Sequence, residues 1–215
     1  MKLTKQKAAH NRQRIVETAG RLFREQGFDG VGVADLMKVA GFTHGGFYNH
    51  FPSKDALAAE AASSGLNTSN SKLSDALVDT ENSGTSGLAK FVERYLSSEH
   101  RDDRAGGCTI ASLAGDAARE TEEIQASFAK GIEEELGILA SYFAKNASED
   151  QGSPLSARER AIRLMAELVG AVILARAVAR GNRSLSDELL RTARHTLLEK
   201  LDASRLPSQP RKKRA

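Results

Sequence analysis

The sequence predicts an all-α protein of about nine helices, in which a small N-terminal domain precedes a larger helical one. Apolar residues recur every three or four positions along most of the chain, which is the period of helices that bury one face. The composition is 40% hydrophobic with only four prolines in 215 residues, as expected of a globular protein. A chain of this length can build one small module and one core of ordinary domain size.

Two short helices joined by a tight turn are predicted near the N-terminus. The buried stripe of the first helix consists of Val33, Leu36, Met37 and Ala40. Gly41 then ends that helix, because glycine adopts the left-handed conformation without steric cost, and Thr43 can cap a second helix over residues 44–51. Two short helices joined in this way are the signature of a helix-turn-helix.

The second helix is expected to have an apolar and a polar side. Phe47 and Phe51 are one turn apart and can pack inward with Phe42, whereas Asn49 falls nearly opposite them. The glycine pair at 45–46 costs about 1 kcal/mol per residue relative to alanine in a helix interior. A bare backbone there would permit close approach to a groove or phosphate. The alternative is a loose loop that carries two glycines.

The end of this helix also carries signals. Pro52 stops the helix, and Ser53 is a good N-cap for the next one, with Asp55 placed favourably in its first turn. Lys54 is thereby held where a ligand for a nucleic-acid phosphate belongs.

Residues 15–57 resemble the DNA-binding domain of the TetR family of repressors. The resemblance rests on a helix at 12–26, the Gly27-Phe28 pair that follows it, the helix at 34–40 and the run Phe47-Tyr48-Asn49-His50-Phe51-Pro52-Ser53-Lys54. It covers about the first sixty residues. It implies an all-helical homodimer with a helix-turn-helix DNA-binding domain, at 1–53, and a helical ligand-binding and dimerisation domain, at 54–204. Apart from the resemblance, the sequence predicts a basic flexible tail at 205–215.

The resemblance also implies which residues contact DNA. Phosphate contacts fall on Tyr48, His50 and Lys54, and positions near base edges fall on Thr43, His44, Gly45, Gly46 and Asn49. Two departures from the family pattern stand out. Gly32 replaces the usual Ser or Thr as N-cap of the second helix, and the glycine pair leaves few long side chains for reading bases. Sequence preference is therefore expected to rely on DNA shape, thymine methyls or water.

The net charge of +3 hides an uneven distribution. Residues 1–14 and 205–215 each carry five basic residues and no acid, so the body between them is acidic. An N-terminal arm could add phosphate or minor-groove contacts through Lys2, Lys5, Lys7, Arg12 and Arg14. The alternative is a solvated, disordered leader. For the C-terminal tail we favour a solubilising end over a second DNA contact.

Beyond residue 53 the apolar spacing predicts helices throughout. The first runs over 54–66 and resumes through 73–77, with an exposed or frayed polar stretch at 67–71 between the two parts. After a loop at 79–87, further helices are expected at 88–95, 110–114, 124–143, 157–180 and 184–202, with a loop at 148–156. The acidic runs at 120–123 and 133–135 are interpreted as solvated helix faces.

The segment 168–175 is apolar around most of its helix and contains Gly170 and Ala171, which let a neighbouring backbone come close. We therefore expect the helices at 157–180 and 184–202 to pair with their symmetry mates in a four-helix dimer interface. The alternative is packing within one subunit only.

The sequence gives little support for catalysis or for binding of a metal or cofactor. The five histidines lack metal-ligand spacing, and no glycine-rich phosphate loop follows a strand. The longest uncharged apolar run, at 168–175, is far shorter than the ~20 residues that cross a bilayer. Residues 1–14 do not resemble a signal peptide. We expect a cytoplasmic protein that is not an enzyme.

An inducer site is expected in the larger domain. Cys108 precedes a helix, where the helix dipole favours a thiolate, and it resembles the thiol by which some TetR-type regulators sense electrophiles or oxidants. The alternative is a small, inert, buried residue. Candidate lining residues are Phe91, Tyr95, Cys108, Leu113, Phe128, Ile132, Met165 and Val169. Such residues are equally typical of a plain core.

The sequence thus predicts a dimeric repressor that binds a palindromic operator in double-stranded DNA and is released by a small-molecule or electrophile inducer. The alternative is a constitutive DNA-binding or architectural protein without an inducer. A remote third hypothesis is an enzyme that uses Cys108.

Overall fold

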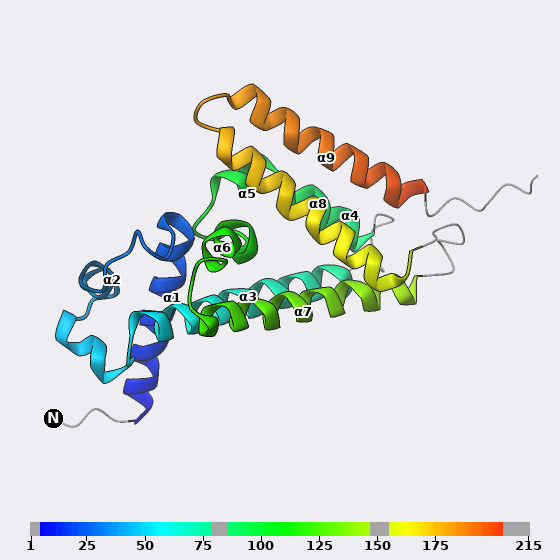
Figure 1. The fold of residues 1–215 in the computed structure, drawn as a ribbon. Coiled ribbons are helices and arrows are strands. Elements are labelled where there is room, and N and C mark those ends of the chain that lie inside the picture. Colours follow the sequence, from blue (N-terminus) through cyan, green and yellow to red (C-terminus); the bar gives the residue numbers. More distant parts are fainter. Residues whose placement is uncertain (1–4, 79–85, 147–154, 204–215) are drawn as a thin grey trace, which may run out of the picture. The chain divides into compact units, whose positions relative to one another are not determined.

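The computed structural model describes residues 5–78, 86–146 and 155–203. Within these ranges every regular element is helical, which confirms the predicted all-α class (Figure 1). The elements are α1 (Lys5–Gln26), α2 (Val33–Ala40), the 3-10 helix η1 (His44–Asn49), α3 (Lys54–Val78), α4 (Gly87–Tyr95), α5 (Ser98–Asp102), α6 (Thr109–Ala117), α7 (Glu122–Lys145), α8 (Ala157–Val178) and α9 (Arg183–Ala203).

Three elements differ from the sequence-based expectation. Helix α1 begins at Lys5 rather than at residue 12, because residues 5–13 are mostly good helix formers without glycine or proline. Helix α3 continues without a break through the polar stretch at 67–71, where Asn70 is buried and its Nδ2 donates to the Gly131 carbonyl at 3.1 Å. The short helix α5 was not expected. The predicted loops at 79–87 and 148–156 lie largely outside the described residues.

The chain packs as two units. Unit 1 comprises Met1–Lys72 and Glu99–Glu134, and unit 2 comprises Leu73–Ser98 and Glu135–Ala215. Helices α3 and α7 each contribute residues to both units. The predicted division at residue 53, which separates DNA binding from regulation, stays a prediction, and the predicted tail at 205–215 lies outside the described residues.

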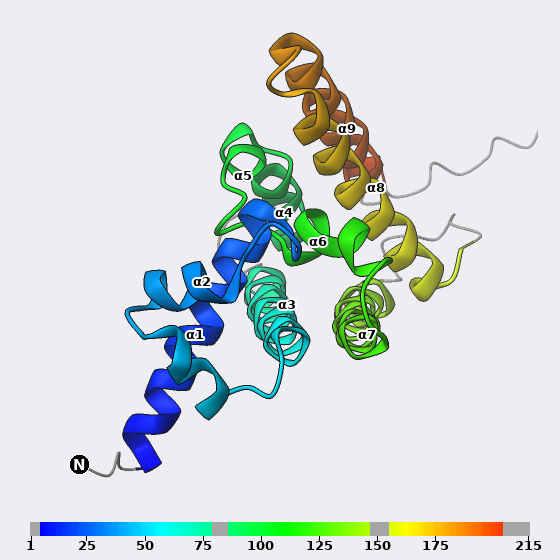
Figure 2. The same ribbon diagram turned by 60° about the vertical axis from the view of Figure 1, so that its left-hand side comes forward.

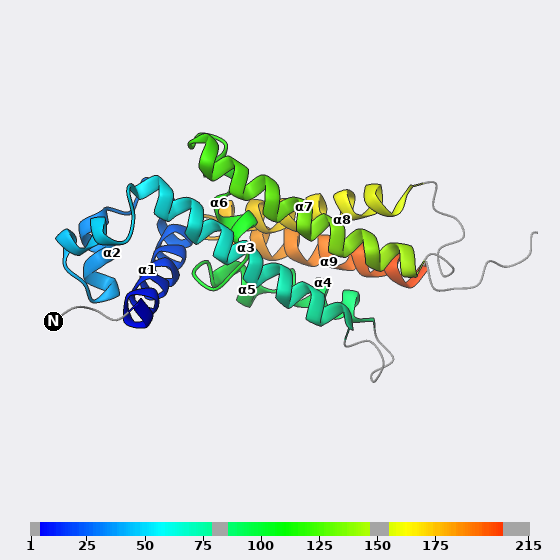
Figure 3. The ribbon, with the colours of Figure 1, turned by 90° about the horizontal axis from the view of Figure 1, so that it is seen from below.

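In unit 1, α1 packs against α2, and α2 packs against η1 (Figures 2 and 3). The buried face of α1 includes Ile15, Ala19, Leu22 and Phe23, which share one side of the helix. The Phe23 and Phe28 rings meet at 5.3 Å between centroids. Burying each such large side chain contributes about 1.5–3 kcal/mol, so this face holds the N-terminal helices together.

In unit 2, α8 and α9 pack side by side (Figure 1). The buried face of α8 contains Leu164, Leu168, Val172 and Ala175. A capping box starts this helix: the Ser156 hydroxyl accepts from the Glu159 N–H at 3.2 Å, and the Glu159 carboxylate accepts from the Ser156 N–H at 2.8 Å. The hydrogen bonds from Ser156 lower the pKa of Glu159. The predicted start of this helix is confirmed.

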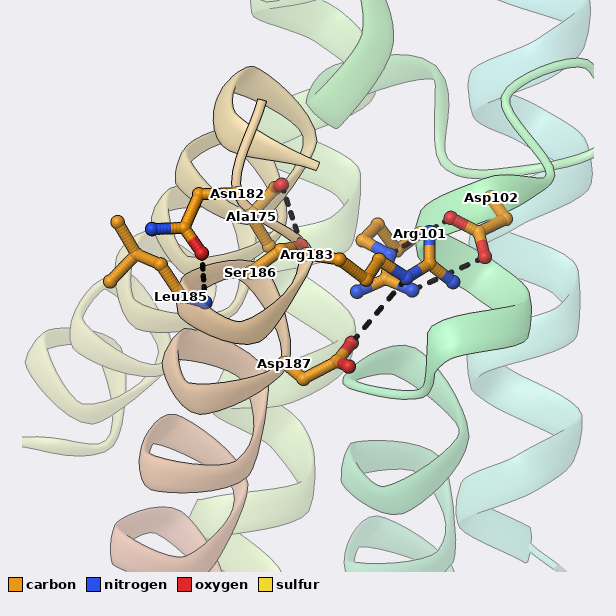
Figure 4. Close-up of polar contacts among 8 residues, drawn as sticks. All are labelled: Arg101, Asp102, Ala175, Asn182, Arg183, Leu185, Ser186 and Asp187. Carbon is orange, nitrogen blue, oxygen red and sulfur yellow. Dashed lines mark hydrogen bonds and ion pairs between the residues drawn. The ribbon is translucent and has the colours of Figure 1, made fainter. Parts of the chain in front are cut away.

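Polar contacts fix the turn from α8 to α9 (Figure 4). The Asn182 side chain accepts from the Leu185 N–H at 3.0 Å and caps α9, and the buried Ser186 hydroxyl donates to the Ala175 carbonyl at 2.8 Å.

A buried arginine in unit 1 is paired with the residue next to it. Arg101 Nε donates to the Asp102 carboxylate at 2.9 Å (Figure 4). A buried guanidinium needs such pairing because its desolvation is costly.

The acidic run at 133–135 is not a fully solvated face, as the sequence suggested. Glu133 and Glu134 are exposed, but Glu135 is only 8% exposed. Burial disfavours the charged carboxylate and raises the pKa of Glu135 to about 7. The helical period explains the difference, because consecutive positions on a helix face different directions.

Glu135 should make stability depend on pH. Its folded-state pKa lies above the ordinary value of an unfolded glutamate, so the free energy of unfolding falls as pH rises from about 4.5 through about 7. Glu135→Gln removes this titration. Its free energy of unfolding relative to wild type should therefore rise between pH 5 and pH 8, by up to about 3 kcal/mol, as measured by urea denaturation. A parallel pH profile for the two proteins would contradict the burial argument. Glu134→Gln, which removes an exposed carboxylate from the same helix, is the matched control.

Candidate nucleic-acid interface

The turn between α2 and η1 has the predicted geometry. Gly41 has φ 82° and lies in the left-handed region. Its N–H donates to the Lys38 carbonyl at 3.1 Å, while the Phe42 N–H donates to the Met37 carbonyl at 2.8 Å. These two bonds satisfy carbonyls that the end of α2 would otherwise leave unpaired. Gly32 is the N-cap of α2, as predicted, and provides no side-chain bond.

The segment after this turn is a 3-10 helix rather than the expected α-helix. Its cap at Thr43 makes no side-chain hydrogen bond, and the Gly46 N–H donates to the Thr43 carbonyl at 3.0 Å, three residues back. The same spacing recurs from the His50 N–H to the Phe47 carbonyl at 2.8 Å. The two glycines disfavour an α-helix, and so short a segment is readily held in the tighter form.

The apolar side of η1 is buried as predicted. Phe47 and Phe51 are each 1% exposed, and their ring centroids lie 5.7 Å apart. Tyr48 meets the Phe47 ring edge-on at 5.2 Å and remains 68% exposed. Phe42 is only half-buried, and its ring centroid lies 6.4 Å from that of His50. The aromatic side chains thus anchor η1 while Tyr48 faces solvent.

None of the eight predicted DNA contacts is buried. The exposed residues are Thr43, His44, Gly45, Tyr48 and Asn49, and the half-buried ones are Gly46, His50 and Lys54. Seven of them lie within or next to η1, and Lys54 begins α3. The Ser53 hydroxyl accepts from the Ala56 N–H at 3.0 Å, which confirms Ser53 as the cap of α3. All eight fall within residues 43–54, and their roles in DNA binding stay predictions.

Arg12 fixes the far end of η1. Its Nη1 donates to the His50 carbonyl, its other nitrogens bind the Glu60 carboxylate on α3, and its guanidinium lies 4.1 Å from the centre of the Phe51 ring. One side chain on α1 therefore holds η1 and α3 together. Arg12 was predicted as an arm residue for phosphate or minor-groove contacts, and its bond to Glu60 was not expected, because Glu60 lies far away along the chain.

Arg14 has a related role at the other end of the turn. Its Nη2 donates to the Ala40 carbonyl in the last turn of α2 at 3.1 Å, and its guanidinium lies 5.3 Å from the centre of the Phe42 ring. Of the other predicted arm residues, Lys5 and Lys7 lie exposed in the first turn of α1, and Lys2 falls outside the described residues. The predicted arm is thus largely helical.

The predicted inducer-site residues are distributed over both units. Phe91, Tyr95, Met165 and Val169 belong to unit 2, whereas Cys108, Leu113, Phe128 and Ile132 belong to unit 1. Within unit 2 the Phe91 and Tyr95 rings lie 5.6 Å apart. Val169 and Ile132 are half-buried, and the other six are buried. Their part in a ligand site stays a prediction.

Cys108 caps α6, close to the predicted start of that helix. It is 8% exposed, and its N–H donates to the His100 Nε2 at 3.1 Å. Its side chain makes no capping hydrogen bond. Among the described residues, no cluster of histidine, cysteine or acidic side chains could hold a metal ion. No helix in the same ranges is long and apolar enough to span a bilayer.

Comparison with known proteins identifies the N-terminal helices. The family model described as bacterial regulatory proteins, tetR family, matches residues 15–61. The N-terminal helices of the chain belong to the TetR family of bacterial regulatory proteins. The matched range covers the second half of α1, all of α2 and η1, and the start of α3, which is the geometry described above.

The TetR-family assignment is supported by individual relatives. The repressor NemR of Escherichia coli (strain K12) is 23% identical over 129 residues, which cover 60% of this chain and 65% of NemR. The regulator AcrR of Shigella flexneri is 42% identical over 57 residues, or 26% of each chain. Each alignment thus spans less than two thirds of the relative. LmrA of Bacillus subtilis (strain 168) is 24% identical over 76% of this chain and 85% of LmrA.

Solved structures of TetR-type regulators share the fold. The reduced form of E. coli NemR matches with a TM-score of 0.76 and 20% identity over 88% of this chain and 96% of that one. A TetR regulator from Chloroflexus aurantiacus J-10-fl matches with a TM-score of 0.75 and 23% identity over 92% and 96%. At these identities the likeness establishes the fold alone.

Arg12→Gln should weaken the DNA-binding helices without unfolding the whole chain. The substitution leaves the His50 carbonyl without its charged donor and Glu60 without its partner, which should cost about 1–2 kcal/mol. Hydrogen exchange at η1 should accelerate, and affinity for DNA should fall. Arg21→Gln on the same helix removes only an exposed pair with Glu25 and should change stability by less than about 0.5 kcal/mol. Equal effects of the two substitutions would show that Arg12 does not hold η1.

Proposed function

We propose that this chain is a dimeric repressor that binds a palindromic operator and is released from it by an inducer. The observation that carries the proposal is the surface of η1, where exposed polar side chains lie opposite the buried Phe47 and Phe51 rings. From α1, Arg12 binds the carbonyl that follows η1, and Arg14 binds the end of α2. A short element that is rigidly held and exposed on one side is suited to entering a DNA groove. Such a regulator acts in the cytoplasm, together with the DNA it binds.

The residues of this surface divide into two roles. Tyr48, His50 and Lys54 contact phosphates and so position the domain, since phosphate contacts carry no sequence information. The residues that approach base edges are Thr43, His44, Gly45, Gly46 and Asn49. Because the glycines have no side chains with which to read bases, Asn49 and His44 carry most of the direct readout, and DNA shape supplies the rest.

Binding should therefore weaken steeply as salt rises, since each subunit displaces counterions from several phosphates. Lys54→Ala should lower specific and nonspecific affinity alike and reduce the salt slope by about one for each subunit. Asn49→Ala should change the ranking of operator variants, with about 1–3 kcal/mol lost at one base position. Fluorescence anisotropy on specific and scrambled duplexes measures both effects. The roles are reversed if Lys54→Ala alters preference but leaves nonspecific affinity intact.

The dimer is proposed to form through α8 and α9. Only part of the apolar segment 168–175 is covered within the chain: Leu168, Val172 and Ala175 are buried, whereas Ile173 and Leu174 are 42% and 56% exposed. On the same two helices Ile162 is 47% exposed and Leu185 is 39% exposed. Large apolar side chains in such number on one helix pair are typical of a contact surface. A symmetric dimer buries this surface and holds two η1 elements for two half-sites.

Gly170→Glu should prevent this association. A Cβ at Gly170 meets no atom of the chain within 4 Å, so the subunit can fold around the new side chain, but a carboxylate would stand among the exposed apolar residues. The variant should sediment as a helical monomer with weak operator affinity. Gly137→Glu is the matched control, because that helical glycine also has open space around it. A fully dimeric Gly170→Glu would place the interface elsewhere.

The inducer is proposed to be a small molecule or an electrophile. Cys108 is the residue with which an electrophile would react. Cys108 is the N-cap residue of α6, and the dipole of that helix favours a thiolate. Burial lowers the pKa of Arg24, while Asp103 and a Cys108 thiolate raise it, so the guanidinium and the thiolate attract each other. At 8% exposure, only a small reagent reaches the sulfur. Its role is sensing rather than catalysis, in line with relatives that are regulators.

A quinone should release the wild-type protein from its operator and spare Cys108→Ser, which should bind DNA normally because the substitution changes one buried atom. Alkylation of the folded protein, followed by mass spectrometry, measures the reactivity of the thiol directly. Equal release of both proteins would make the inducer a noncovalent ligand and Cys108 a structural residue.

A further inference from the structure

Unit 1 contains a groove that neither the DNA-binding surface nor the predicted inducer site uses. Its volume is 230 Å³, and its walls come from α1, from α3 and from the residues that begin α6. We call it the α1–α3–α6 groove. None of the predicted inducer-site residues lines it. Ligand sites for drug-sized molecules are ordinarily larger than about 300 Å³, so the groove fits a small molecule.

One wall of the groove carries a positive charge with open hydrogen-bond donors. The Arg24 Nε donates to the Ala105 carbonyl at 2.6 Å. Among the described residues its two terminal nitrogens have no hydrogen-bond partner. Burial lowers the pKa of Arg24, and nearby Asp103 only offsets part of that effect. A guanidinium that is partly desolvated without a bound carboxylate favours an anion from solution.

A second wall carries a buried hydroxyl without a partner. Thr109 is 1% exposed, and its Oγ1 makes no hydrogen bond to any described residue. This hydroxyl points towards α3, because a Cβ built on Gly65 would lie 2.5 Å from it and 3.2 Å from the Arg24 Nη1. Gly65 also lines the groove, so the guanidinium and the hydroxyl converge on the same bare stretch of α3. A buried unpaired hydroxyl is uncommon and calls for a partner.

The start of α6 supplies a third feature. Thr109 is the first residue of this helix, and its N-cap residue, Cys108, makes no capping hydrogen bond to the N–H groups of the first turn. The N–H groups of the first turn and the helix dipole therefore favour a negative charge at this end. Two other charged residues line the groove: Lys72 adds a positive charge, and Glu17, which accepts a hydrogen bond from Gln13, opposes it. The net charge of the lining is positive.

We propose that the α1–α3–α6 groove binds a small anion, the carboxylate or phosphate group of a metabolite. Arg24 would bind the anion through its terminal nitrogens, the Thr109 hydroxyl would donate to it, and the start of α6 would face it. Anion binding in the groove does not depend on the proposed operator or inducer; only its effect on operator affinity rests on the proposed function. A ligand there would contact α1 and α3, the two helices that Arg12 joins at η1, so its binding is expected to change operator affinity.

The test is isothermal calorimetry and thermal unfolding of the full chain with inorganic phosphate, sulfate and succinate, each at constant ionic strength with chloride as the balance. Wild type should show saturable binding of at least one probe and a matching rise in Tm. Phosphate and sulfate binding would indicate a phosphate ligand, and succinate binding a carboxylate. No saturable response to any of the three probes would overturn the proposal.

Three variants locate the site. Thr109→Val removes the hydroxyl without changing the shape of the side chain, Arg24→Gln removes the charge, and Gly65→Ala fills the space between them. Each should weaken binding tenfold or more, whereas Arg21→Gln, which removes an exposed charge from the same helix, should bind as wild type does. If Arg24→Gln and Gly65→Ala fold poorly, the affinity of Thr109→Val still tests the proposal. Equal affinity of wild type and Thr109→Val would place the anion elsewhere and overturn the proposal.

Discussion

The contact on which the DNA-binding region depends is the engagement of Arg12 with the His50 carbonyl, the Glu60 carboxylate and the face of the Phe51 ring. On its own η1 would not be a stable helix, because it is a 3-10 helix with two glycines and is shorter than the helices that persist in isolation. Its shape is therefore imposed by its neighbours. The buried Phe47 and Phe51 rings anchor η1 by apolar contacts, and Arg12 donates the hydrogen bond that the His50 carbonyl needs.

Helix α1 positions its neighbours by polar contacts as well as by apolar packing. It presents an apolar face to α2 through residues such as Ile15 and Phe23, and its polar side carries three arginines that reach backbone carbonyls. Arg12 reaches the end of η1, Arg14 the end of α2, and Arg24 the segment before α6. A guanidinium has five donors in a fixed plane, so it can satisfy a carbonyl and still bind a second group. One helix thus sets the position of three others in unit 1.

Local signals in the sequence predicted the features that depend on neighbouring residues. The left-handed Gly41, the cap at Ser53 and the buried pair Phe47 and Phe51 follow from steric preference and helical spacing, and each is confirmed. Features that depend on distant residues were missed. Nothing in the sequence near Arg12 indicates Glu60. Glu135 looked like its exposed neighbours, because burial depends on which elements pack against that side of α7.

The 3-10 form of η1 has a steric consequence for whatever the segment meets. With three residues per turn, side chains three positions apart stand in one column, so Tyr48 rises directly beyond Gly45 and Asn49 beyond Gly46. A methyl group on Gly45 would touch nothing in the chain within 4 Å, and one on Gly46 would make only ordinary contacts. Internal packing therefore does not demand these glycines. At Gly45 the missing side chain leaves open space beside the exposed Tyr48, whereas Gly46 lies against Thr43 and Met37, so the surface of η1 is hollowed at one glycine and closed at the other.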